Sequence, residues 1–240
     1  AHLGVFVCVA LVLRSVRASR ELRGTGPMLI TFGSTAYLGI PYATYAFGSQ
    51  GTTYAALLSV LLVVTLLFAS IAMLNRADHH RESGSTLHQL LELPFLWAVI
   101  LGLAWPLLRL PGLPLAIDRL IDILADSAGP TALLGLGTFL FDLKFERMPW
   151  RWAIPIGMGK VFLPTLATFA ILSALGISGL RLAVGTAMGA VSTGVTTFIL
   201  STEYRIGREL TAGTILASTI ASLGALSIIS WLWLGTDVFR

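Results

Sequence analysis

Two stretches of the sequence combine hydroxyl side chains with glycine in otherwise apolar surroundings. Residues 31–41 read TFGSTAYLGIP, and residues 185–197 read GTAMGAVSTGVTT. Hydroxyls and backbone N–H groups donate hydrogen bonds, and the N-terminus of a helix carries partial positive charge. Where glycine or proline interrupts a helix, these groups become available to an anion, typically a carboxylate. The candidate donors are Ser34, Thr35, Ser192, Thr193 and Thr196.

The same stretches have a simpler interpretation. Gly185 and Gly189 form a small-xxx-small pattern, which lets two helices pack closely without binding anything. The presence of two such stretches, one of them containing Pro41, favours a pair of interrupted helices instead.

Ionisable residues inside apolar segments are the second group of candidates. Lys160 is a candidate for charge balance or coupling, because a lysine within a membrane is costly; snorkelling to the interface is the alternative. Asp118, Asp122 and Asp126 share one helical face, and Asp126 is the candidate for a coupling proton. The alternative is an amphipathic helix start that faces water.

The remaining reactive side chains do not suggest an enzyme, a cofactor or a metal site. His79, His80 and His88 cluster in one polar loop, with no strong ligand spacing. The sequence has no Gly-x-Ser-x-Gly or His-Glu-x-x-His motif, and none of its histidines falls in the middle of an apolar segment. A single cysteine, Cys8, excludes an internal disulfide.

The composition indicates the kind of scaffold that must position these residues. Of 240 residues, 55% are hydrophobic and 12% charged, and the mean hydropathy is +0.83. Soluble domains carry about twice that charge. The sequence therefore predicts an all-α polytopic membrane protein, an expected multi-pass protein of the inner or plasma membrane. Eight apolar segments are expected at about 3–13, 27–47, 54–74, 93–108, 116–141, 152–175, 182–202 and 210–234.

Basic residues between these segments predict the orientation. Eleven lie in alternate gaps and three on the opposite side, which places the larger set in the cytoplasm. The larger set is Arg14, Arg17, Arg20, Arg23, Arg76, Arg81, Lys144, Arg147, Arg151, Arg205 and Arg208. The smaller set is Arg109, Arg181 and Arg240. The first segment is only half a span long, so we expect upstream sequence to be missing.

The order of the segments predicts an inverted repeat within one membrane transporter domain, residues 1–240. Segments one to three run span, interrupted span, span, and segments six to eight repeat this plan in the opposite orientation. Residues 1–75 are expected to form the first-repeat helices three to five, and residues 88–240 the second repeat. The two interrupted helices would cross near the middle of the membrane.

The quoted motifs resemble those of the auxin efflux carrier family, whose bacterial members include malonate and malate permeases. FGSTAYLGIP at 32–41 resembles its fourth helix, GKVFLP at 159–164 its eighth, and the segment 179–204 its ninth. The family usually has asparagine at the position of Ser34, often preceded by proline where this chain has Gly33, and a crossover proline where it has Ser192.

The resemblance implies ten helices in two inverted repeats of five, of which the first two would be missing here. It also implies substrate contacts at the matching positions. These positions are Ser34, Thr35, Gly39, Pro41, Ser192, Thr193, Gly194 and Thr196.

The sequence thus predicts a secondary active transporter of small organic anions such as malonate or malate, working by alternating access. The lipid bilayer and a small carboxylate are the expected partners; proton coupling and a homodimer stay hypotheses, and no nucleic acid is expected. A sodium-coupled symporter of the bile acid type is one alternative. A non-transporting membrane sensor or a degenerate fragment is the other.

Overall fold

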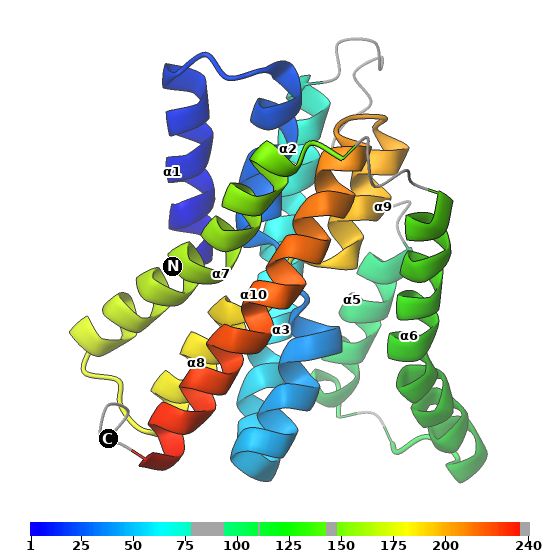
Figure 1. The fold of residues 1–240 in the computed structure, drawn as a ribbon. Coiled ribbons are helices and arrows are strands. Elements are labelled where there is room, and N and C mark those ends of the chain that lie inside the picture. Colours follow the sequence, from blue (N-terminus) through cyan, green and yellow to red (C-terminus); the bar gives the residue numbers. More distant parts are fainter. Residues whose placement is uncertain (78–93, 110, 143–147, 236–240) are drawn as a thin grey trace. The chain divides into compact units, whose positions relative to one another are not determined.

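The structure is a computed structural model that describes residues 1–77, 94–109, 111–142 and 148–235 (Figure 1). The chain divides into two compact units. The first contains Ala1–Glu82 and Glu146–Arg240, and the second contains Ser83–Phe145. The histidine-rich loop lies outside the described residues. We describe each unit by itself.

The first unit is built from helices that are mostly apolar on the outside. Its elements are α1 (His2–Ser15), α2 (Arg20–Thr31), the π-helical turn η1 (Thr35–Gly39), α3 (Ile40–Ala77), α7 (Trp150–Ala174), α8 (Leu180–Ala190), α9 (Val195–Glu203) and α10 (Arg208–Gly235). Figure 1 shows the ends of α1, α3 and α9 and the starts of α2, α7 and α10 together at one end of this unit.

Helix α3 turns back on itself at Gly48. Gly48 has φ 72° and ψ −165°, a conformation that essentially only glycine adopts. Thr52 Oγ1 donates to Thr44 Oγ1 at 2.9 Å across this turn. Eight residues would separate these atoms by about 12 Å along a straight helix. Residues 40–47 therefore complete the interrupted span, and the rest of α3 forms the next antiparallel helix.

Glycines set the close packing of α7 against its neighbours. A Cβ added to Gly157 would lie 2.9 Å from the backbone nitrogen of Ser218 in α10, and one added to Gly189 would lie 2.8 Å from Thr165 Cα. Real Cβ atoms do not approach backbone so closely, so both contacts require glycine. Around them, a core cluster joins α8 and α10 through residues such as Leu182 and Leu226.

The second unit contains two described helices, α5 (Pro94–Leu107) and α6 (Leu115–Asp142). Asp118 and Asp122 are exposed on α6. Asp126 also belongs to α6, but its side chain lies outside the described residues. The structure therefore does not test its coupling role, which stays a prediction.

The structure confirms the predicted class, an all-α membrane protein. Within the described residues, three stretches are long and apolar enough to cross a membrane: Thr35–Arg76, Trp150–Ala174 and Arg208–Gly235. The first of these includes the turn at Gly48, so it contains the second half of the interrupted span and the span that follows. Side chains such as Leu61, Leu166 and Ile220 are more than 60% exposed, as expected for helices in lipid.

Candidate functional site

The two interrupted helices cross inside the first unit, and their extended residues pair at the crossing. Gly33 and Thr193 form an antiparallel bridge. The backbone N–H of Ser34 donates to Ser192 O at 2.8 Å, and that of Gly194 donates to Phe32 O at 2.9 Å. Each extended segment thus supplies hydrogen-bond partners to backbone groups that the interruption of the other helix leaves free. Such pairing allows an interruption at membrane depth without lipid contact.

The crossing forms without the prolines that the related motifs carry. Phe32 and Val191, which end α2 and α8, are extended, with ψ 101° and 153°. A Cβ added to Gly194 would lie 3.1 Å from the carbonyl oxygen of Gly33. Glycine therefore lets the two backbones approach to hydrogen-bonding distance, and the bridge itself holds the extended conformation.

Buried hydroxyls brace this crossing. Thr193 Oγ1 donates to Leu29 O at 3.0 Å, and the Thr193 backbone N–H donates to Ser218 Oγ at 3.0 Å. Thr35 Oγ1 is 2.9 Å from Ser59 Oγ. These bonds tie α8–α9 to α2 and α10, and η1 to the long arm of α3. Thr35 and Thr193 therefore lie at the crossing with hydroxyls that are already engaged within the protein.

Ser34 and Thr196 occupy the more accessible positions. Both are partly exposed, and neither side chain makes a hydrogen bond within the described part of the chain. They lie where η1 and α9 begin, and neither helix start has a side-chain cap. Uncapped first turns present free N–H groups and the positive end of the helix dipole. This face of the crossing can accept an anion.

Lys160 lies beside the crossing, and its side chain does not snorkel to the membrane interface. Its side chain is fully buried, and Nζ donates to Gly189 O at 3.0 Å and to Val191 O at 2.8 Å. These carbonyls belong to the C-terminal end of α8 and its first extended residue. The structure therefore excludes snorkelling for this lysine, and its role in charge balance or coupling stays a prediction.

The other predicted positions have different surroundings. A Cβ on Gly39 would come 2.7 Å from Met188 Sδ, so this glycine allows η1 to pack on α8. Pro41 is exposed at the start of α3, where a proline is tolerated. Ser192 is buried and contributes its carbonyl to the crossing. The part of these residues in substrate binding stays a prediction.

Sequence reasoning missed Ser59 and Ser218, which support Thr35 and Thr193. Both serines are buried within long apolar helices. A serine within an apolar span is the available signal, since a buried hydroxyl needs a partner. Its partner lies in another helix, and the sequence does not say which.

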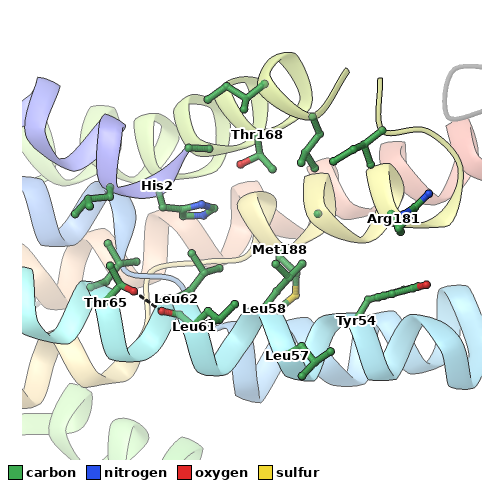
Figure 2. Close-up of a pocket in the computed structure, with 17 residues that line it drawn as sticks. His2, Tyr54, Leu57, Leu58, Leu61, Leu62, Thr65, Thr168, Arg181 and Met188 are labelled. Atoms are coloured by element: carbon green, nitrogen blue, oxygen red, sulfur yellow. Dashed lines mark hydrogen bonds between the residues drawn. The ribbon is translucent and has the colours of Figure 1, made fainter. Parts of the chain in front are cut away.

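A separate cavity of about 520 Å³ lies between α1, α3, α7 and α8 (Figure 2). Its walls are mainly leucines, including Leu57, Leu61 and Leu62. Figure 2 shows Arg181 and Tyr54 at one end and His2 and Thr65 towards the other. The apolar lining does not suit a small dicarboxylate, so this cavity is a weaker candidate than the crossing.

Comparison with known proteins agrees with this architecture. Residues 2–230 match the protein family described as "Membrane transport protein". The chain belongs to this family, the auxin efflux carrier family. It is 22% identical over 206 residues to a protein of Rhizobium meliloti (strain 1021) named "Putative malonate transporter". It is 26% identical over 198 residues to an "Uncharacterized transporter" of Methanothermobacter thermautotrophicus.

These matches establish the auxin efflux carrier resemblance. The alignments cover 84% and 82% of this chain, and the chain spans 64% of the length of each relative. The family comprises membrane transport proteins.

Proposed function

We propose that the protein is a secondary active carrier of small organic anions such as malonate or malate, and that it works by alternating access. The observation that carries the proposal is the pair of uncapped helix starts at the crossing, beside the hydroxyls of Ser34 and Thr196, which make no hydrogen bond to any described residue. Free N–H groups, hydroxyls and positive helix ends together suit a carboxylate. The name of the Rhizobium relative points to the same substrate class.

The division into two units supports alternating access. The crossing belongs wholly to the first unit, while α5 and α6 form the second. In inverted-repeat carriers, one bundle moves against another around a central site. We propose that the first unit carries the anion and moves against the second, in a multi-pass protein of the cell membrane. Lys160 and Asp126 are the proposed coupling residues, protons the proposed coupling ions, and a homodimer the proposed assembly.

Two alternatives stay open. A sodium-coupled symporter would need oxygen ligands for sodium at the crossing. Glu203, which is exposed at the end of α9, is the first carboxylate in the sequence after the crossing segment. That segment itself therefore offers no carboxylate to sodium. A non-transporting sensor would bind the same anions without moving them.

The test is uptake of labelled malonate, malate and related acids into proteoliposomes that contain the full-length protein. The assay is run with and without a pH gradient and with sodium or choline. We expect saturable uptake that responds to the pH gradient and not to sodium. Sodium-dependent uptake would favour the symporter, and anion binding without uptake would favour the sensor.

Two variants connect transport to the crossing. We expect Ser34→Ala and Thr196→Val each to lower the rate of uptake about tenfold, because a lost hydrogen bond to a charged ligand costs about 1.5 kcal/mol. Thr53→Val is the matched control, since Thr53 is an exposed residue of α3 whose hydroxyl donates to Ser49 O of the same helix. Uptake by both site variants at the rate of the control would refute the assignment of these residues.

A further inference from the structure

Lys160 places a buried ammonium group at the crossing, and its surroundings are those of a bound cation. Nζ contacts two backbone carbonyl oxygens, Gly189 O and Val191 O. Its side chain has no solvent exposure. Within the described residues, no carboxylate pairs with it.

The carbonyls that hold Lys160 lie where a helix end attracts positive charge. Helix α8 ends at Ala190, so Gly189 O belongs to its last turn, and Val191 O to the extended segment that follows. The carbonyls of a last turn are unpaired and carry the negative end of the helix dipole. In carriers with interrupted helices, such carbonyls can coordinate a cation.

The other extended segment at the crossing, which contains Gly33, leaves room for the ammonium group. A Cβ added to Gly33 would lie 3.4 Å from Lys160 Nζ and 2.7 Å from Val191 Cγ2. Gly33 therefore allows the two extended segments and the ammonium group to share one small space. The lysine arrives from α7, a third element, and links it to the broken end of α8.

We propose that the Lys160 ammonium is a resident cation that replaces a bound alkali cation at the crossing. It neutralises the carbonyls at the broken end of α8, so the carrier needs no sodium to hold its interrupted helix. The consequence of this inference for transport, that the carrier needs no sodium, rests on the proposed function. The site itself is defined by the contacts of Lys160 alone.

The experiment measures the thermal unfolding temperature of the full-length protein in detergent, with no substrate present, at neutral pH. Choline, sodium and methylammonium chlorides are compared at equal ionic strength. We expect the unfolding temperature of the wild-type protein to be the same in all three salts. We expect Lys160→Ala to unfold at a lower temperature in choline, and to be restored in part by sodium or methylammonium, with saturation.

Two variants serve as controls. Lys160→Met fills the space without a charge, so we expect it to be less stable than the wild-type protein and to respond to no cation. Met158→Ala truncates an exposed side chain of the same helix, and we expect no cation response from it either.

Three results would overturn the proposal. They are stabilisation of the wild-type protein by sodium, a Lys160→Met protein as stable as the wild type, and a folded Lys160→Ala protein that ignores both small cations. If Lys160→Ala does not fold, the wild-type and Lys160→Met measurements decide by the same criteria. Because no substrate is used, failure of the carrier hypothesis in the uptake assay would be seen separately.

Discussion

At the scale of single residues, the hydroxyls at the crossing divide into two groups. Thr35 and Thr193 bond within the protein, to Ser59 and to Leu29. Ser34 and Thr196 make no such bonds in the described part of the chain. Residue types that look equivalent in the sequence thus have different surroundings. The first group is expected to govern stability, and the second the binding of an anion.

Thr193→Val tests the structural group. The substitution keeps the shape of the side chain and removes the bond from Oγ1 to Leu29 O, which leaves a buried carbonyl without this partner. We expect the free energy of unfolding to fall by about 1–3 kcal/mol, measured by thermal unfolding in detergent.

Thr219→Val is the control for this change. Thr219 lies on α10, and its hydroxyl donates to the Ile215 carbonyl of its own helix. We expect its effect on the unfolding temperature to be smaller. Equal effects of the two substitutions would contradict a bracing role for Thr193.

At the scale of elements, the interruptions are positioned by their neighbours. The end of α2 and the end of α8 are paired by backbone hydrogen bonds at the crossing. The chain then turns at Gly48, so that η1 packs against the long arm of α3 through the bond between Thr35 and Ser59. The crossing therefore depends on the turn at Gly48, which lies further along the chain in α3.

Gly48→Ala tests that dependence. At φ 72° and ψ −165° an alanine is strained, and we expect the substitution to destabilise the protein by about 1–3 kcal/mol. Gly224→Ala is the control, because a Cβ there would contact nothing within 4 Å and the residue lies in a regular helix. Thermal unfolding of both variants provides the measurement; a Gly48→Ala protein as stable as Gly224→Ala would show that the turn tolerates a side chain.

At the scale of the whole molecule, the arrangement of the first unit agrees with the predicted orientation. The ends of α1 and α3 and the start of α10, which carry Arg14, Arg76 and Arg208, lie at one end of this unit (Figure 1). Arg181, near the start of α8, belongs to the opposite end. Basic residues gather at the cytoplasmic side of membrane proteins, so the first end is expected to face the cytoplasm.

Cysteine labelling in intact cells tests this orientation. In a Cys8→Ser background, Ser178→Cys places a thiol in the exposed turn between α7 and α8, and Ser15→Cys places one at the exposed end of α1. We expect a membrane-impermeant maleimide to label the first variant from outside, and the second only after lysis. The reverse pattern would invert the topology.

The sequence determined the class of the protein, the approximate spans and the two interrupted helices. The apolar length of a span and a glycine-rich, hydroxyl-rich segment within it are both local properties of the sequence, and lipid requires each span to be long and predominantly apolar. It also determined which residues lie at the crossing, since Ser34 and Thr193 fall within those segments.

Only the tertiary structure decided how those residues are used. The bridge between Gly33 and Thr193 joins positions 160 residues apart, and the partners of Thr35 and Lys160 come from other helices. The partner of a buried hydroxyl or ammonium is chosen by packing between helices, and local sequence patterns do not encode distance in space. For the same reason, only the packing of α7 against α8 shows that Lys160 bonds the end of the broken helix and does not snorkel.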